Sequence, residues 1–218
     1  MLAAINPFNI MTPSKIDKDV ERLIKKLNAT HTPIYLDIEP EKGAEIKDCF
    51  PVVQLKVKEK GGRMVMGWQI WKSKHLIEAE CHAVWEDEEG ELRDITPKDL
   101  NINNILFVED ENMVYDEKQI DNIRLNITNN PLVDDLINVC KAIYNFDNKG
   151  ERALHYDLTF LLTNVQKEHR HYLFEIKDMI NFILSHNGNR KSLCPCNGQL
   201  HFKNCHGKDL DKKVIKDI

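Results

Sequence analysis

The chain has 218 residues, of which 42% are hydrophobic and 30% charged, and its formal net charge is -5 at pH 7. This composition is typical of a soluble globular protein, and the negative balance disfavours a general nucleic-acid binder, which is normally basic. No apolar run reaches the roughly 18 residues of a membrane span, so the sequence predicts no transmembrane helix.

The N-terminal residues 1–8 lack a basic region followed by an apolar core, so we expect no secretion signal. The chain has six cysteines. Three lie in a C-terminal motif described below, which leaves Cys49, Cys81 and Cys140. An odd remainder beside a candidate thiolate metal site indicates reduced thiols and a cytoplasmic location.

The first elements predicted along the chain are a helix, an extended segment and a second helix. Apolar residues recur at helical spacing over residues 13–29, and residues 31–40 read as extended. The segment after Cys49 fits a helix or a strand. We favour a helix, because Pro51 would stand at an early position where proline is tolerated and Gly61 would end the helix.

The next segment has the pattern of an antiparallel meander. Strands are expected at 63–71, 76–85 and 91–96, with further strand material at 105–108 and 113–115. On strand alternation, Glu78, Glu80 and His82 share one face of the second strand, which predicts a polar cleft or a solvent-exposed face. Trp68 and Trp71 either line a groove or fill a core beneath the sheet.

From residue 130 onward the pattern becomes helical. Residues 132–144 predict one helix and residues 151–186 predict one long helix or two, ending at 187–189. We therefore predict an α+β fold: an antiparallel sheet with an N-terminal helix and a central cysteine-bearing helix, then a helical segment and a small zinc knuckle. The expected boundaries are 1–130 for the α+β domain, 131–187 for the helical segment and 188–218 for the knuckle and tail.

Cys49, His82 and Asp94 form a candidate catalytic set. A nucleophilic thiol needs a lowered pKa, a base within hydrogen-bond reach and a group that orients the base. Cys49 stands at a predicted helix N-terminus, where the helix dipole favours a thiolate. His82 and Asp94 lie on strands joined by a short acidic hairpin, which can place a carboxylate beside an imidazole.

This region, residues 43–97, resembles the transglutaminase-like and arylamine N-acetyltransferase-like group of papain-type cysteine enzymes. The resemblance is carried by Cys49, by the segment His82-Ala-Val-Trp and by the segment Gly90-Glu-Leu-Arg-Asp-Ile-Thr-Pro. Trp85 stands one place later than in that group, and Asp94 is followed by Ile-Thr-Pro instead of Pro-Thr. The resemblance implies acyl transfer or amide hydrolysis through a thioester.

In this enzyme hypothesis His82 draws the proton from Cys49 and Asp94 holds the imidazole tautomer. The backbone N–H of Cys49 would stabilise the oxyanion, with Gln54 or Gln69 as a second donor. The alternative is structural, because most free cysteines are buried small hydrophobes. His82 would then pair with a glutamate of its own strand, and Asp94 would close a turn.

The sequence Cys194-Pro-Cys196 is followed after eight residues by Cys205-His206-Gly207. Three sulfurs and one imidazole make a complete tetrahedral ligand set for zinc, with no position left for a substrate water. The spacing therefore predicts a structural Zn²⁺ site, formed by Cys194, Cys196, Cys205 and His206, that folds a knuckle.

The stretch 194–207 resembles the SEC-C motif, the zinc module at the C-terminal tail of a bacterial secretion ATPase and of many otherwise unrelated proteins. The matching residues are Cys194, Pro195, Cys196, Phe202, Lys203, Cys205, His206 and Gly207. The family usually has Gly-Ser-Gly after the second cysteine, where this chain has Asn-Gly-Gln.

Two functions follow as hypotheses. The first is a cysteine-dependent acyl-transfer or amide-hydrolysing enzyme that uses the knuckle as a docking module. The second is a non-catalytic adaptor that binds a protein, ribosomal or nucleic-acid partner through the knuckle. A protein partner is favoured over nucleic acid, because aspartates temper the basic tail.

Overall fold

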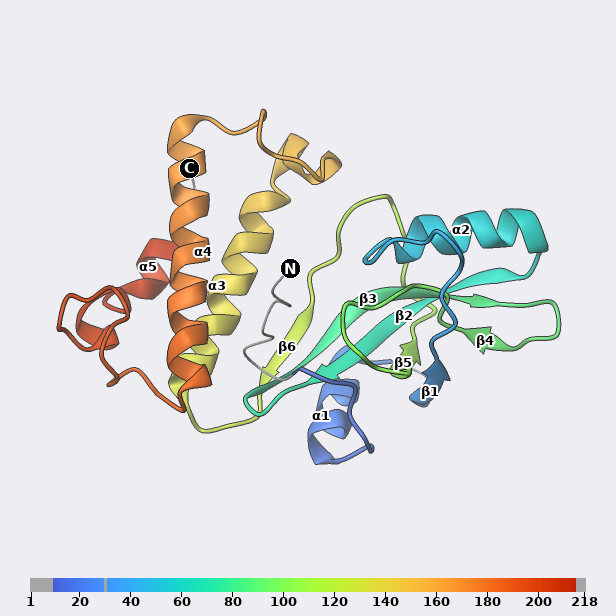
Figure 1. Ribbon diagram of the computed structural model, residues 1–218, viewed down its shortest axis with the longest axis horizontal. Coiled ribbons are helices and arrows are strands. Elements are labelled where there is room, and N and C mark those ends of the chain that lie inside the picture. The colour runs from blue at the N-terminus through green and yellow to red at the C-terminus, as the bar shows by residue number, and fades with distance from the viewer. Residues whose placement is uncertain (1–9, 30, 215–218) are drawn as a thin grey trace.

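The computed structural model describes residues 10–29 and 31–214. The fold is α+β, as predicted, with an antiparallel sheet beside a helical part (Figure 1). Residues 1–8, on which the expectation of no secretion signal rests, lie outside the described residues, as do the last four residues of the tail segment.

The bounds of the helices depend on their capping residues as much as on the spacing of their apolar residues. Asp17 caps the first helix by accepting hydrogen bonds from two backbone N–H groups, so this helix begins later than the pattern at 13–29 predicts. In chain order the helices are α1 (Lys18–Leu27), α2 (Cys49–Lys60), α3 (Pro131–Asp147), the 3₁₀ turn η1 (Gly150–Leu154), α4 (Asn164–Ser185), the 3₁₀ turn η2 (Phe202–Asn204) and α5 (Leu210–Val214).

The strands form one antiparallel sheet in the order β1-β5-β2-β3-β4, and β6 pairs with β3. The long hairpin of β2 and β3 is its centre, and the meander predicted for 63–96 is confirmed. The strands are β1 (Ile34–Asp37), β2 (Arg63–Lys72), β3 (Leu76–Glu86), β4 (Leu92–Arg93), β5 (Asn104–Glu109) and β6 (Ile123–Asn126).

The two ends of the sheet path meet at Asp94, which follows β4. Its backbone N–H donates to the carbonyl of Asp37, and its carbonyl accepts from the N–H of Glu39, just beyond β1. This contact bends the sheet toward a barrel. It also buries Asp94 completely, which fixes a carboxylate inside the fold.

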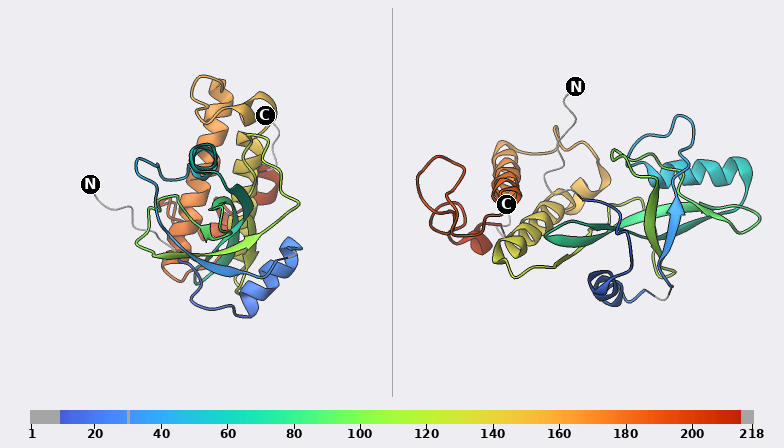
Figure 2. Two further views of the ribbon diagram at one scale, coloured as in Figure 1. Left: turned by 90° about the vertical axis from the view of Figure 1, so that its right-hand side faces the viewer. Right: turned by 60° about the horizontal axis from the view of Figure 1, so that its bottom comes forward.

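Helices α1 and α2 lie on different sides of the sheet (Figures 1 and 2). The α1 side has a core that includes Trp68 and Ile70 of β2, so Trp68 fills a core instead of lining a groove. The α2 side has a smaller core in which Cys49 and Val53 pack against Ala83 of β3. The cysteine-bearing helix is therefore held directly on the strand that carries His82.

Helices α3 and α4 lie side by side at one end of the molecule, and the C-terminal knuckle packs against them (Figure 1). Phe202 and Cys194 of the knuckle belong to the same buried cluster as the apolar residues of α3 and α4. The residues predicted as separate segments, 131–187 and 188–218, thus share one hydrophobic core over their described part.

Three local expectations differ from the structure. Residues 113–115 are irregular, although strand was expected there, and β6 was not expected. The apolar pattern at 151–186 continues as helix only from α4 onward, because the chain first forms η1 and then a run of turns. Thr163 and Gln166 begin α4 with a capping box, which explains why the helix starts there. Among the described helices, none is both long enough and apolar enough to cross a membrane.

Candidate active site and metal site

Cys49 occupies the first position of α2, as predicted. The helix then runs to Lys60 and ends at Gly61, whose φ of 75° favours glycine. The Cys49 side chain is buried, with 7% of the residue exposed, and lies among Val53, Ala83 and Ile95. The backbone N–H groups of the first turn of α2 have no partner within the helix, so their partial positive charge lies close to the sulfur.

His82 lies in the middle of β3, directly opposite Gly67 of β2. A Cβ on Gly67 would come within 2.1 Å of the carbonyl oxygen of Val108 and 2.7 Å of the Phe107 ring. Only glycine therefore allows β5 to approach β2 this closely beside the histidine. The imidazole is held within the fold, with 5% of the residue exposed.

The structure brings the three candidate catalytic residues together. Nε2 of His82 lies 3.1 Å from Oδ1 of Asp94, and the same oxygen accepts the backbone N–H of Thr96 at 3.1 Å. Cys49 lies close enough to the imidazole for each group to shift the pKa of the other. Because Nε2 faces Asp94, the ring nitrogen that remains for the thiol is Nδ1.

The charges of this group shift each pKa in the direction that favours an ion pair. Burial by itself raises the pKa of the Cys49 thiol, but the hydrogen bond and the charge of His82 outweigh it, and the pKa is lowered. Burial and Lys98 lower the pKa of His82, yet Asp94 and Cys49 together raise it to about 9. Both shifts favour the pair of thiolate and imidazolium over the pair of neutral thiol and neutral imidazole.

Lys98 is a member of the site that the sequence reasoning missed. Its Nζ lies 2.7 Å from Oδ2 of Asp94 and 3.2 Å from Nε2 of His82, and the side chain is 9% exposed. Lys98 follows Asp94 by four residues, but neither residue lies in a helix or a strand. This spacing therefore does not predict a contact between them. Only the turn through Thr96 brings the lysine back to the carboxylate.

The glutamates of β3 do not pair with His82. Glu78 forms an ion pair with Arg124 at 2.9 Å, and Glu80 accepts a hydrogen bond from Nε1 of Trp71 at 2.6 Å. Of the two glutamines considered as oxyanion donors, Gln54 is exposed on α2. Gln69 is buried two residues beyond Gly67 and its Nε2 has no hydrogen-bond partner, so it retains a free donor in the sheet.

Aromatic side chains surround the approach to Cys49. The ring of Phe50 stacks on that of Tyr115, with centroids 3.9 Å apart and planes 6° apart. Tyr115 lies between β5 and β6, and its pKa is raised to about 12 by burial and by Tyr156, which follows η1. The β5–β6 connection thus passes close to the N-terminus of α2 (Figure 1).

The candidate metal ligands of the knuckle also come together. One ligand atom from each of Cys194, Cys196, Cys205 and His206 lies within 4.8 Å of the others. Nδ1 of His206 is 3.2 Å from Sγ of Cys194 and 3.4 Å from Sγ of Cys205, and the sulfurs of Cys196 and Cys205 are 3.5 Å apart. Three thiolates and an imidazole at these separations can bind a metal ion.

The loops that carry these ligands are fixed by short-range contacts. Cys194 and Leu200 are joined by a backbone hydrogen bond, which closes the turn after the first cysteine pair. A Cβ on Gly207 would come within 2.6 Å of the Phe202 ring, so glycine lets the chain pass this buried ring. An ion pair between Arg190 and Asp135 ties the start of the knuckle to α3.

Comparisons of the chain with family models, with curated proteins and with solved structures gave no match. The two resemblances noted in the sequence therefore rest on the residues that carry them. The function has to be argued from the geometry of the site.

Proposed function

We propose that the chain is a cysteine-dependent enzyme of acyl transfer or amide hydrolysis, with Cys49 as nucleophile, His82 as acid and base, and Asp94 as the group that orients the imidazole. The observation that carries this proposal is the buried hydrogen bond between His82 and Asp94, next to a buried Cys49 whose pKa is lowered by His82 despite burial. A cysteine that serves only as a small hydrophobe needs neither an imidazole partner nor a carboxylate behind that imidazole.

The chemistry follows from the arrangement. The Cys49 thiolate attacks an acyl carbon and forms the C–S bond of a thioester. The bond from that carbon to the leaving nitrogen or oxygen breaks, and the imidazolium gives its Nδ1 proton to the departing amine or alkoxide. Water, or an acceptor amine, then gives a proton to His82 and attacks the thioester carbon. The C–S bond breaks and the thiolate is restored.

The backbone N–H of Cys49, at the first position of α2, supports the same assignment as a donor for the developing oxyanion. Gln69 is the better of the two candidate side-chain donors, because its buried Nε2 has no hydrogen-bond partner among the described residues. The rings of Phe50 and Tyr115 favour an acyl group with a flat apolar part.

The test uses 4-nitrophenyl acetate as a general acyl donor and intact-protein mass spectrometry as the readout. We expect the wild type to acquire one acetyl group on Cys49 at neutral pH. The variant His82→Ala should be acylated on the order of 100 times more slowly, since general base assistance is lost. Lack of acylation at Cys49 in the folded wild type would contradict the proposal.

For the knuckle we infer that the bound metal is zinc and that its role is structural. Three cysteines and one histidine supply four protein ligands and match the preferences of Zn²⁺. Metal analysis should find about one equivalent of zinc per chain, lost in the double variant Cys194→Ser and Cys205→Ser. A zinc-free wild-type protein that is fully folded would contradict this inference.

The adaptor hypothesis retains one supporting observation. Leu193, which precedes the first cysteine pair, and Leu200, whose carbonyl accepts the backbone N–H of Cys194, are 65% and 51% exposed. Exposed leucines on the knuckle favour a protein contact. The variant Cys49→Ala separates the two functions in the native host, because an adaptor keeps its biological role without the thiol whereas the proposed enzyme loses it.

A further inference from the structure

The ammonium of Lys98 lies within hydrogen-bond distance of both the Asp94 carboxylate and Nε2 of His82. It is 2.7 Å from Oδ2 of Asp94 and 3.2 Å from Nε2 itself, while Oδ1 of Asp94 is 3.1 Å from the same nitrogen. A cysteine nucleophile with a histidine and an aspartate needs no lysine at this position. A largely buried ammonium beside an imidazole therefore calls for its own explanation.

The nitrogen Nε2 cannot satisfy both neighbours in one protonation state. When it carries a proton it donates to Asp94, and the ammonium of Lys98 then opposes it. When it lacks a proton it accepts from Lys98, and the remaining ring proton is on Nδ1, toward Cys49. The readiness of the His82 ring to lose a proton thus depends on the charge of Lys98.

We propose that Lys98 is a positioning residue of the site, whose ammonium holds the Asp94 carboxylate beside Nε2 of His82 and whose charge favours the loss of a proton from both the Cys49 thiol and the His82 imidazolium. This inference rests on the proposed function. Its consequence is that the imidazolium gives its Nδ1 proton to the leaving group more readily, while the Nε2 proton stays on the ring and faces Asp94. The neutral ring that remains has Nδ1 free to accept the proton of water or of an acceptor amine.

Other charged groups near this set do not replace Lys98. The groups that act on His82 are Cys49, Asp94 and Lys98. Cys49 in turn acts on Cys81 of β3 and on Tyr115 of the β5–β6 connection, both of which are neutral near pH 7 because burial raises the pKa of each to about 12. Lys98 is thus the cation that acts on the pair formed by Cys49 and His82.

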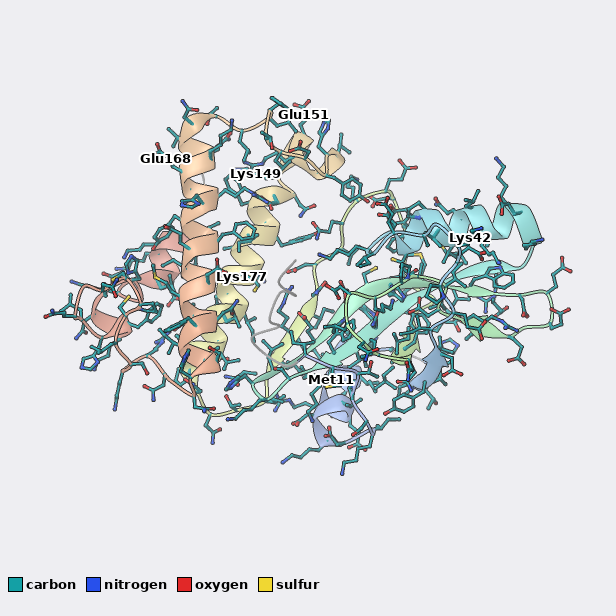
Figure 3. All side chains as sticks on the ribbon, viewed as in Figure 1. Met11, Lys42, Lys149, Glu151, Glu168 and Lys177 are labelled. Carbon is teal, nitrogen blue, oxygen red and sulfur yellow. The ribbon has the colours of Figure 1, made fainter. Side chains whose placement is uncertain are left out.

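The test measures the rate at which iodoacetamide alkylates Cys49 between pH 5 and 10, quantified by mass spectrometry of the peptide that contains it. The variants are Lys98→Met, which keeps the length and removes the charge, and Lys98→Arg, which keeps the charge. The control is Lys42→Met, which removes an exposed lysine of the connection before α2 (Figure 3). Circular dichroism verifies that each variant is folded.

Removal of a neighbouring cation makes each deprotonation harder. We therefore expect the midpoints of the alkylation profile to rise by about one pH unit in Lys98→Met and to stay near those of the wild type in Lys98→Arg and Lys42→Met. If the wild-type profile departs from that of an ordinary thiol and Lys98→Met has the same profile, the role of Lys98 is overturned and the proposed function stands. A wild-type profile of an ordinary exposed or inert thiol would overturn the proposed function and the role of Lys98 together.

A second measurement does not depend on the folding of a variant. Nitrogen-15 NMR of the histidine rings distinguishes a proton on Nδ1 from one on Nε2. Above pH 9 the neutral His82 of the wild type should carry its proton on Nε2, toward Asp94, and the midpoint of its titration should be lower than in Lys98→Met. A wild-type ring that carries the proton on Nδ1 would refute the inference directly.

Discussion

Four side chains with alternating charge determine the behaviour of the site at the scale of single residues. In chain order they are Cys49, His82, Asp94 and Lys98, and each is at least largely buried. Charges in such an environment interact more strongly than on the surface, because little water screens them. Each therefore sets the protonation of its neighbours, and a change at one position should appear as a shifted pH dependence.

The stability of the variant Cys49→Ser should fall as the pH rises above about 6.5. Burial and Lys98 oppose the charged form of His82, but Asp94 and Cys49 together outweigh them and raise the pKa to about 9 in the wild type, and the contribution of Asp94 remains in the variant. A raised pKa contributes stability that is complete below the unfolded value and is lost as the pH passes the folded value. The serine removes the opposite contribution of the thiolate.

Thermal unfolding across this pH range measures the effect. The matched control is the double variant Cys49→Ser and His82→Gln, in which the slope should be smaller. Equal slopes in the two proteins would show that His82 is not protonated in the folded state near neutral pH.

The residue scale is also where the sequence was least informative. Cys49 could be placed because a glycine ends its helix and a proline suits the first turn. His82 and Asp94 could be paired because they flank a short hairpin. Lys98 and the Tyr115–Tyr156 contact could not be predicted, because they depend on how irregular segments fold back in space.

At the scale of elements, the site is built where a helix begins and two sheet edges meet. The first residue of α2 provides the thiol, the centre of β3 the imidazole, and the residue after β4 the carboxylate. Strand alternation predicted β2 and β3 well, because long strands with buried faces carry a clear pattern. It missed β6, since four partly buried residues between turns acquire their structure only by pairing with β3.

Helix α4 offers a test of the capping argument. In Thr163→Ala the hydrogen bond to the backbone of Gln166 is lost, which should lower the free energy of unfolding by about 1 kcal/mol. Thr163→Ser keeps the hydroxyl and should stay close to the wild type. Urea denaturation measures both, and an alanine variant as stable as the serine variant would show that the cap does not hold the helix.

At the scale of the whole molecule, the knuckle packs into the hydrophobic core of the helical part and is not an independent module. Phe202 is completely buried and Leu210 nearly so, and both pack with α3 and α4. The candidate catalytic set lies in the other half of the structure, on α2, on the sheet and just after β4. Metal binding should therefore support the helical part and act on the thiol only indirectly.

Removal of the metal tests this division. With a chelator, or in Cys205→Ser, hydrogen exchange should become faster in α3 and α4 as well as in the knuckle, because they share one core. The variant Lys203→Ser is the control, since it removes an exposed side chain beside the ligands. Faster exchange confined to the knuckle would contradict the shared core.

The central claim is that Cys49, although buried, is a reactive thiolate, whereas the half-buried thiols of Cys81 and Cys140 are inert. One experiment tests it: brief labelling of the native protein with iodoacetamide at neutral pH, with the modified peptides counted by mass spectrometry. Burial raises the pKa of Cys140 and that of Cys81, the latter to about 12, whereas His82 lowers that of Cys49 despite burial. The account predicts that Cys49 is labelled far ahead of Cys81 and Cys140. Labelling of Cys49 as slow as that of Cys140 would contradict it.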